Sequence, residues 1–243
     1  MRKKGYLDFH SHILPGVDDG SKNMEMTKEM LKKMYEEGVR NVLATSHSYP
    51  NRKGRSVEEL IELTKQVNQI AKEISPDLEV YTGQELFYRE SLAQELDDKK
   101  VLTLAGTDYV LVEFHPKERF QKICDGVSKL MQHGYYPVIA HVERVETLIG
   151  NPEHMHELVK MSCYMQVNAG SLQGGFFDRR TRTVLKMIKE GYIHFIGSDC
   201  HNLDSRPPRM KACVDKLYKK ISKSMVEDLL FENQRKFLQN EYL

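Results

Sequence analysis

Hydrophobic and polar positions along the chain alternate between two kinds of segment. Short apolar or β-branched runs lead through polar turns into longer stretches, in which apolar residues recur with the period of a helix. The short runs predict strands, which we place at residues 6–9, 42–45, 79–81, 109–113, 137–140, 164–167 and 193–196.

The longer stretches predict amphipathic helices. Met26 and Met30 share one face of a helix expected over residues 25–37, and a glycine follows where helices commonly end. Ser56 and Glu59 have the spacing of a capping box, which predicts a helix from there to about residue 74. The other helices are expected at about 91–96, 120–133, 180–190, 210–221 and 225–231, with one more opening at Asn151-Pro152.

Strands that alternate with helices indicate βα units and a parallel sheet, so the fold class is α/β. The chain shows no linker, low-complexity segment or internal repeat, and we expect residues 1–243 to form a single domain. Periodicity leaves open whether the sheet closes into a barrel or stays open. The positions of the polar residues bear on that choice.

Nearly every expected strand ends at a residue that can bind a metal ion or a phosphate. The first strand leads to His10 and His12, whose side chains point the same way in an extended chain. In closed α/β barrels the carboxyl ends of the strands meet at one edge, where active sites are built. This pattern favours a barrel around one polar site. The residues at or just beyond the other strand ends are His47, Glu85, Glu113, His141 with Arg144, Asn168, and Asp199 with His201.

The candidate ligands are imidazoles and carboxylates, with no thiolate required. Such donors suit manganese, iron or zinc in water-accessible catalytic sites. They are too numerous for one ion, so we expect a carboxylate-bridged cluster of two or three ions, an arrangement that recurs in phosphoester hydrolysis. The candidates are His10, His12, Asp19, His47, Glu85, Glu113, His141, Asp199 and His201.

Composition narrows the class of protein. The chain has 36 basic and 35 acidic residues, a formal net charge of +1 that does not favour binding to nucleic acid. No apolar run approaches the length of a membrane span, and Asp8 and His10 follow the basic start too closely for a signal peptide. The four cysteines show no zinc-ribbon spacing, which predicts a reduced, cytoplasmic protein.

Several short motifs occur in a fixed order along the whole chain. They are His10-Ser11-His12, Thr45-Ser46-His47, the strand end at Glu85, the run Ala140-His141-Val142-Glu143-Arg144, and Ser198-Asp199-Cys200-His201. Together they resemble the PHP (polymerase and histidinol phosphatase) superfamily. The early Asp18-Asp19-Gly20 and the late run from His201 to Pro208 resemble, more narrowly, the bacterial manganese-dependent protein-tyrosine phosphatases of capsular and exopolysaccharide synthesis.

This resemblance implies a distorted (β/α)7 barrel that holds three metal ions. Mn²⁺ is the expected metal, with iron or zinc as alternatives. By motif, the ligand sets are His10, His12, Glu85 and Asp199 for one ion, Glu85, Glu113 and His141 for a second, and Asp19, His47 and His201 for a third. In the third set, Asp18 is an alternative to Asp19.

The resemblance also implies a substrate and further roles. It implies hydrolysis of phosphotyrosine on a protein, for which we expect the C-terminal tail of a bacterial tyrosine kinase. Arg144 and Arg206 are expected to bind the phosphate, because a guanidinium group can form hydrogen bonds with two phosphate oxygens at once. Either Asp199 or His201 protonates the leaving phenolate, or no general acid is needed. The last helices either form an oligomer interface or close the barrel.

One spacing points to a different mechanism. Cys200 and Arg206 fit the C-x5-R pattern of cysteine-dependent tyrosine phosphatases, in which a thiolate attacks the phosphorus. Such a loop cradles phosphate with successive backbone N–H groups, often with the help of glycine. This segment contains no glycine and leads into Pro207-Pro208, which have no N–H group. We interpret the spacing as a coincidence.

Other functions and roles are kept as alternatives. A small-molecule phosphatase such as a histidinol-phosphate phosphatase would share the same metals, and a noncatalytic regulatory barrel would be expected to lose some of the ligands. A metal-dependent nuclease gains no support from the net charge. His154 is expected on a helix surface and His194 in a structural role. The basic Arg52, Lys53 and Arg55 form either a solvated loop or a contact for an acidic peptide.

Overall fold

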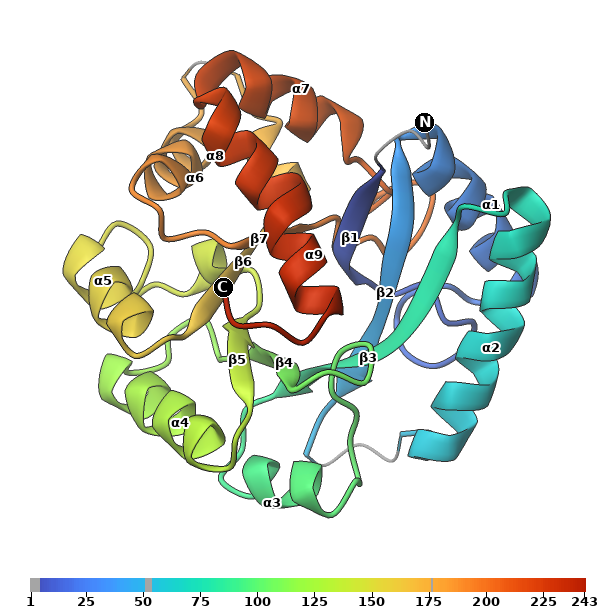
Figure 1. Ribbon diagram of the computed structural model, residues 1–243, viewed down its shortest axis with the longest axis horizontal. Helices are drawn as coiled ribbons and strands as arrows, with labels where there is room; N and C mark the ends of the chain where they lie inside the picture. Colours follow the sequence, from blue (N-terminus) through green and yellow to red (C-terminus); the bar gives the residue numbers. More distant parts are fainter. Residues whose placement is uncertain (1–4, 51–53, 176) are drawn as a thin grey trace.

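The computed structural model describes residues 5–50, 54–175 and 177–243. Within these ranges, seven parallel strands follow one another in chain order, each hydrogen-bonded to the next (Figure 1). Every strand expected from the sequence is present, and several are longer at their carboxyl ends. The strands are β1 (Tyr6–Ser11), β2 (Val39–Ser48), β3 (Glu79–Phe87), β4 (Tyr109–Glu113), β5 (Tyr136–Ile139), β6 (Tyr164–Asn168) and β7 (Phe195–Gly197).

Backbone contacts between the first and last strands bring the sheet close to closure. The N–H of Asp199 donates to the carbonyl of His10 at 2.7 Å, and the N–H of His12 donates to the carbonyl of Cys200 at 2.9 Å. Gly197 makes this approach possible, because a Cβ there would lie 2.4 Å from the Cβ of His10. The prediction of a distorted (β/α)7 barrel is therefore confirmed.

Helices surround the barrel (Figure 1). They form because each presents one apolar face to the strands, as α1 does with Met30, Leu31 and Met34, all fully buried. Burying one such side chain contributes roughly 1.5–3 kcal/mol. The helices are α1 (Met24–Glu36), α2 (Val57–Ile74), α3 (Leu92–Asp97), α4 (Phe120–Gln132), α5 (Pro152–Lys160), α6 (Arg179–Lys189), α7 (Lys211–Lys220), α8 (Lys223–Glu227) and α9 (Asn233–Leu238), with 3-10 turns at Val142–Arg144 and Ala169–Leu172 and a π-helical turn at Asp228–Glu232.

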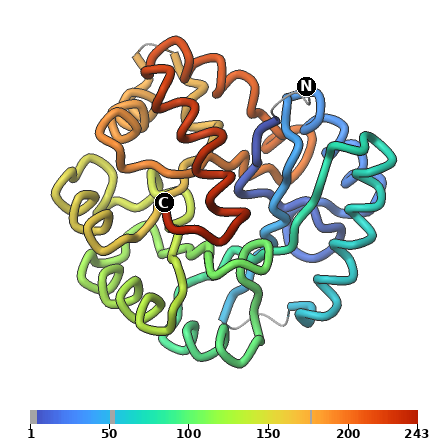
Figure 2. The backbone as a smooth tube through the Cα atoms, viewed as in Figure 1, coloured from blue at the N-terminus to red at the C-terminus, as the bar shows by residue number. Residues whose placement is uncertain are grey.

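The C-terminal segment closes the amino end of the barrel. The sequence predicts a last helix that ends near residue 231, but the chain continues through the π-helical turn into α9, which crosses the barrel opening (Figures 1 and 2). Phe237 of α9 is fully buried and packs against Phe9 and Tyr109, at ring-centroid distances of 5.0 and 5.2 Å. The hydroxyl of Tyr109 donates to the carbonyl of Glu241 at 2.6 Å. Of the two roles left open for the last helices, closing the barrel is thus confirmed.

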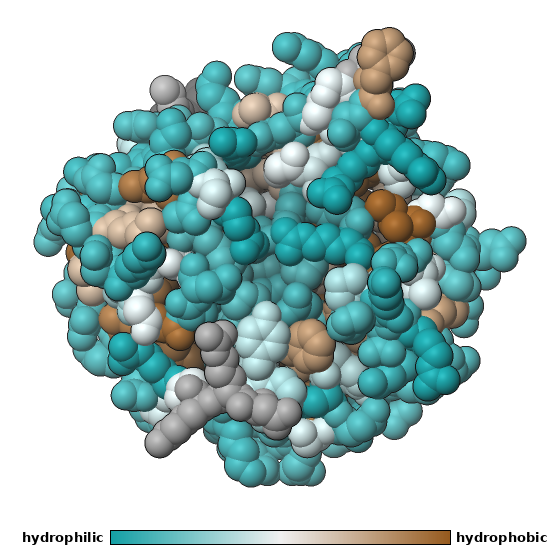
Figure 3. Space-filling view, turned by 180° about the vertical axis from the view of Figure 1, so that it is seen from behind, coloured by the Kyte–Doolittle hydropathy of each residue, from teal (hydrophilic) through white to brown (hydrophobic). Residues whose placement is uncertain are grey.

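One face of the molecule is seen in Figure 3 and is largely hydrophilic. Figure 3 views the face opposite to that of Figure 1, where polar residues dominate and hydrophobic ones are scattered. Among the described residues, no helix combines the length and the apolar character needed to cross a bilayer.

Candidate metal centre

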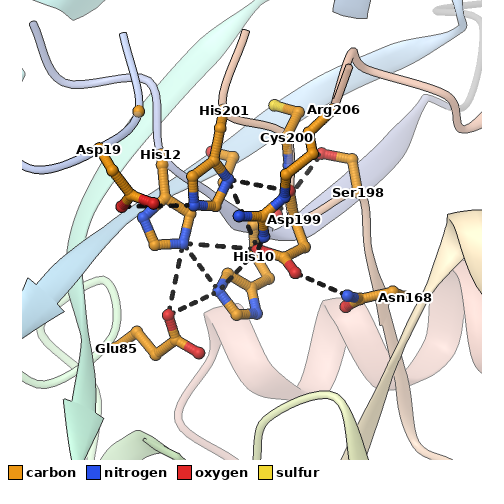
Figure 4. A network of polar contacts seen from close by, with 12 residues as sticks. His10, His12, Asp19, Glu85, Asn168, Ser198, Asp199, Cys200, His201 and Arg206 are labelled. Carbon is orange, nitrogen blue, oxygen red and sulfur yellow. Dashed lines mark hydrogen bonds and ion pairs between the residues drawn. The ribbon is translucent and has the colours of Figure 1, made fainter. Parts of the chain in front are cut away.

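Four side chains from three parts of the barrel converge on one point (Figure 4). The Nε2 atoms of His10 and His12 lie 3.1 Å apart. Both face Glu85 Oε2, at 3.2 and 3.3 Å, and Asp199 Oδ1, at 3.6 and 3.5 Å. Donors that each stand about 2.0–2.2 Å from one ion are separated from one another by roughly 3–3.5 Å. The spacing of the four donor atoms therefore fits a shared cation.

Partners on the far side of each imidazole fix its orientation. His10 Nδ1 lies 3.2 Å from Gln166 Oε1, and His12 Nδ1 lies 2.8 Å from Asp18 Oδ2. In the neutral tautomer whose Nδ1 donates to oxygen, which is the form that binds a metal ion, each Nε2 carries an unshared electron pair. Two such pairs directed at each other across 3.1 Å repel, and a cation between them removes the repulsion. This is the chemistry of a metal site.

Glu85 lies between this group and a second one. Its Oε1 is 2.7 Å from His141 Nε2, and its Oε2 is 2.9 Å from His47 Nδ1. Glu113 Oε1 lies 3.7 Å from the same nitrogen of His141. Glu85 is only 1% exposed, so its carboxylate is buried with both oxygens facing imidazoles. That placement suits a carboxylate that bridges two ions.

Asp19 faces a third group. Its Oδ1 lies 3.4 Å from His47 Nε2 and 3.6 Å from His201 Nε2, and with His12 these residues form a compact set of donors. The Asp19 side chain is 59% exposed, whereas that of His201 is buried. This set therefore opens toward solvent, where a substrate can enter.

Asp18, the alternative to Asp19, is otherwise engaged. Its carboxylate accepts from the ring of His12 and, at 2.9 Å each, from the backbone N–H groups of His47 and Gly20. Gly20 is required in this turn, because a Cβ there would lie 2.2 Å from the carbonyl of His12. Asp18 thus orients the His12 ring, and Asp19 is the carboxylate that faces His47 and His201 as a candidate ligand.

Buried polar atoms of the cluster lack ordinary partners. Within the described ranges, Glu113 Oε2, His141 Nδ1 and His201 Nε2 are buried and form no hydrogen bond. Leaving such a group unpaired costs about 1–3 kcal/mol. Metal coordination is one way to recover this cost at His201 Nε2 and Glu113 Oε2, and both atoms belong to candidate ligands.

The electrostatics of the cluster shift its pKa values in opposite directions. Burial lowers the pKa of His12, but hydrogen bonds to Asp18 and Glu85 raise it to about 10. Burial and the nearby charges of His12 and Arg206 lower the pKa of His201 to about 4. Burial and the Glu85 charge raise the pKa of Glu113 above its usual range. Such divergent shifts within one cluster are typical of functional sites.

Backbone strain also concentrates here. His141 and Asp199 have φ values of 31° and 54°, in the left-handed region that residues with a Cβ avoid. Each such conformation costs roughly 1–3 kcal/mol. Each residue lies two positions beyond the end of a strand, β5 or β7, in the turn that directs a candidate ligand into the cluster.

Two arginines hold the Asp199 carboxylate. Arg144 Nη2 lies 2.7 Å from Oδ2, and Arg206 Nη2 lies 2.7 Å from Oδ1. Asn168 Nδ2 also donates to Oδ2 at 2.7 Å. Each guanidinium has five N–H donors, so both arginines keep donors for another ligand. Their side chains are 41% and 37% exposed, which leaves them accessible from solvent.

The sequence analysis missed one residue of this network. Gln166 accepts from the N–H of His141 at 2.8 Å, faces the ring of His10, and donates to Asn168 Oδ1 at 2.9 Å. A buried glutamine two positions before Asn168 on β6 is the signal that was available, since both side chains point to the same side. Gln166 therefore links three strand ends without offering a ligand.

Cys200 stands apart from the cluster. Its side chain is fully buried among apolar residues, and in Figure 4 its sulfur points away from the imidazoles. Burial raises the pKa of the thiol well above its usual value, so the group stays neutral. A neutral thiol in this position is no nucleophile, and the geometry supports the view that the C-x5-R spacing is a coincidence.

Two further histidines, His154 and His194, lie away from the cluster. His194 is structural, since its Nδ1 faces the N–H of Met165 at 3.2 Å. His154 of α5 faces the carbonyl of Thr147 at 2.7 Å, on the outside of the barrel. Arg52 and Lys53 lie outside the described residues.

Known protein families and relatives match nearly the whole chain. The family described as capsular polysaccharide synthesis, CpsB/CapC, matches residues 6–239. The tyrosine-protein phosphatase CpsB of Streptococcus pneumoniae is 34% identical over 242 residues, which cover 98% of this chain and 100% of that protein. The tyrosine-protein phosphatase YwqE of Bacillus subtilis (strain 168) is 32% identical over 240 residues, covering 97% of this chain and 92% of that protein.

Solved structures share the barrel. Crystal structures of YwqE from Bacillus subtilis and CpsB from Streptococcus pneumoniae, described as unique metal-dependent tyrosine phosphatases, include a chain that superposes with a TM-score of 0.89 at 29% identity, covering 97% of this chain and 95% of that one. The phosphotriesterase homology protein of Escherichia coli superposes with a TM-score of 0.65 at 13% identity, covering 98% of this chain and 100% of that one, a likeness of fold alone.

Proposed function

Because the chain belongs to the CpsB/CapC family of capsular polysaccharide synthesis and is a metal-dependent tyrosine-protein phosphatase, we propose that its active site is the candidate metal centre. The observation that carries this proposal is the pair of Nε2 atoms at 3.1 Å, on His10 and His12, facing the same oxygens of Glu85 and Asp199. A metal cation bound among these four side chains accounts for that arrangement.

We assign the centre three ions, with Mn²⁺ as the metal and iron or zinc as alternatives. Glu85 is the shared ligand, because each of its oxygens faces a different imidazole. Ions held by imidazole and carboxylate would polarise phosphoryl oxygens and lower the pKa of water. The ligand sets are His10, His12, Glu85 and Asp199, then Glu85, Glu113 and His141, then Asp19, His47 and His201, with His12 also close to the last set.

Arg144 and Arg206 bind the phosphate in this proposal. Each is fixed by Asp199 through one nitrogen and keeps further N–H donors for phosphoryl oxygens, whose charge must be stabilised during transfer. Losing one charge-assisted contact costs about 1.5–3 kcal/mol. Arg144→Ala or Arg206→Ala should therefore lower turnover about ten- to hundredfold with unchanged metal content. A variant with wild-type kinetics removes that arginine from the site.

Departure of the phenolate needs no dedicated acid in our proposal. Burial raises the pKa of Asp199, but His10, His12 and Arg144 outweigh it and hold the pKa well below its usual range. The carboxylate therefore carries no proton to donate at neutral pH. His201, with a pKa of about 4, is also unprotonated there. Phenolate, whose conjugate acid has a pKa near 10, is a comparatively good leaving group.

The substrate is a phosphotyrosine-bearing protein, and we propose the C-terminal tail of a bacterial tyrosine kinase. The exposed side of the Asp19 group and the half-exposed arginines suit a phosphotyrosine side chain presented by a chain end. A tail phosphopeptide should be hydrolysed with a higher kcat/KM than histidinol phosphate. A preference for histidinol phosphate would contradict this assignment.

The experiment that tests the site compares metal dependence with thiol dependence. Metal-stripped protein should lose activity on a phosphotyrosyl peptide and regain it with Mn²⁺, and Cys200→Ser should keep this response. Cys213→Ser is the matched control for stability, since both thiols are fully buried. Activity that persists without metal and disappears in Cys200→Ser, but not in Cys213→Ser, would overturn the proposal.

A further inference from the structure

A second pocket adjoins the Asp199 side of the metal centre. It has a volume of about 190 Å³, and four arginines line it, Arg144, Arg180, Arg206 and Arg209, beside a single acidic side chain, Asp199. The arginines come from three parts of the chain: Arg144 from the turn after β5, Arg180 from the first turn of α6, and Arg206 and Arg209 from the loop between β7 and α7. Its lining is therefore strongly cationic.

Only half of these guanidinium groups have a carboxylate partner. Arg144 and Arg206 each lie 2.7 Å from Asp199. In the parts of the chain that the structure describes, no ion pair or hydrogen bond engages the guanidinium group of Arg180 or Arg209, and both residues are exposed. Asp178, next to Arg180, instead accepts from the N–H of Thr181 at 2.6 Å and caps α6. Neither guanidinium group is therefore paired directly with a carboxylate, although the Arg180 charge, after the hydrogen bonds of Thr181, helps to lower the pKa of Asp178.

A single phosphate does not account for all four arginines. A phosphate monoester presents three terminal oxygens. Arg144 and Arg206, fixed by Asp199, already offer several donors to these oxygens, and the metal centre lies on the same side. Arg180 and Arg209 add two cationic groups that binding of one phosphate does not require. Positive charges without a direct carboxylate partner that converge on one pocket lower its affinity for cations and raise its affinity for anions.

We propose that Arg180 and Arg209 bind a second anionic group of the substrate, carried on a residue near the phosphotyrosine. This rests on the proposed phosphatase function and adds a specificity subsite to it. The group is an oxyanion, either the carboxylate of an acidic residue or a second phosphate, because a planar guanidinium group can form two parallel hydrogen bonds with either one. The subsite makes the enzyme selective for phosphotyrosine in an acidic or multiply phosphorylated stretch.

The test measures kcat/KM for three phosphotyrosyl peptides of equal length: one with neutral flanks, one with flanking glutamates and one with a second phosphotyrosine. Wild type should prefer an anionic peptide over the neutral one, and the double variant Arg180→Gln/Arg209→Gln should lower that preference about tenfold. The anionic peptide whose kcat/KM falls more in the double variant identifies the group that the subsite binds. Added salt should reduce the wild-type preference, since exposed ion pairs are screened.

Arg182→Gln is the matched control. Arg182 is an exposed arginine on the same helix that does not line the pocket, so its removal should leave the peptide preference unchanged. Equal loss on all three peptides in the double variant, or a wild type without preference, would overturn the subsite. A wild type that hydrolyses none of the peptides would instead overturn the proposed function.

Discussion

The two ends of the barrel are built from the same strands but treat buried polar groups in opposite ways. At the amino end, Phe9, Phe195 and Phe237 pack together, and the buried hydroxyls of Tyr109 and Tyr164 each have a partner in the C-terminal segment. At the carboxyl end, imidazoles and carboxylates crowd together and several of their atoms lack partners within the described ranges.

This difference assigns stability to the aromatic end of the barrel and metal binding to the polar end. Phe9 and His10 are neighbours on β1, yet one belongs to the aromatic cluster and the other to the metal centre. The aromatic end supplies apolar burial that helps offset the cost of unpaired polar groups and of the left-handed residues at the other end. The imidazoles and carboxylates at the polar end can then keep the positions that binding a cation requires.

The largest expected effect comes from removing the shared carboxylate at the polar end. Glu85→Gln keeps the shape of the side chain but removes the charge that faces His47 and His141. We expect kcat/KM on a phosphotyrosyl peptide to fall by about a thousandfold, comparable with loss of a central electrostatic contact. Metal content should fall as well, whereas the circular dichroism spectrum should not change. Full activity in this variant would show that Glu85 is not a ligand.

The opposite behaviour is expected at the aromatic end. Phe237→Ala removes a fully buried ring that packs on Phe9 and Tyr109, and should lower the free energy of unfolding by about 3–5 kcal/mol. Urea unfolding measures this loss, and kcat per folded molecule should stay close to that of the wild type. A large fall in kcat at full folding would show that the two ends are not independent.

A smaller effect is expected from the network behind the ligands. Gln166→Ala removes the oxygen that orients the His10 ring, and such second contacts typically contribute about ten- to a hundredfold in metal affinity. Titration calorimetry with Mn²⁺ measures the change. Gln84→Ala is the matched control, because the Gln84 side chain is buried but accepts from the backbone N–H of Leu102 instead of holding an imidazole. Equal affinities in the two variants would contradict the positioning role of Gln166.

The last prediction leaves the metal centre unchanged and concerns the pH dependence of stability at His194. Burial lowers its pKa from 6.5 to about 4, so the unfolded chain takes up a proton at a higher pH than the folded protein does. Protonation therefore favours unfolding as the pH falls from 6.5 to 4, by up to about 1.4 kcal/mol per pH unit. In His194→Asn this pH dependence should be absent, so the stability gap to the wild type should narrow on acidification. A gap that stays constant from pH 7 to pH 4 would contradict this.

Much of the polar end follows from the sequence, because strand ends and ligand types are local signals. The i, i+2 spacing of His10 and His12 anticipates the meeting of their rings, and the residues after β5 and β7 are polar in the sequence itself. Gln166 escaped prediction because a glutamine inside a strand is not a ligand type. The contact of Arg144 with Asp199 joins residues 55 positions apart, which no local pattern reveals.

The aromatic end is harder to read from the sequence. Helix α9 was not predicted, because the π-helical turn at Asp228–Glu232 interrupts the spacing of apolar residues and only Phe237 is buried beyond it. The ring contacts of Phe237 reach back to Phe9, near the other end of the sequence, and to Tyr109, near its middle. Tertiary packing, and not local propensity, places this helix.

The central claim is that the lone pairs at the polar end hold the metal ions. Anomalous diffraction from crystals of active, Mn²⁺-loaded protein tests this most directly. We predict a peak bounded by His10, His12, Glu85 and Asp199, with further peaks at the Glu113–His141 and Asp19–His201 groups. Active protein whose manganese peaks all lie away from these residues would contradict the account.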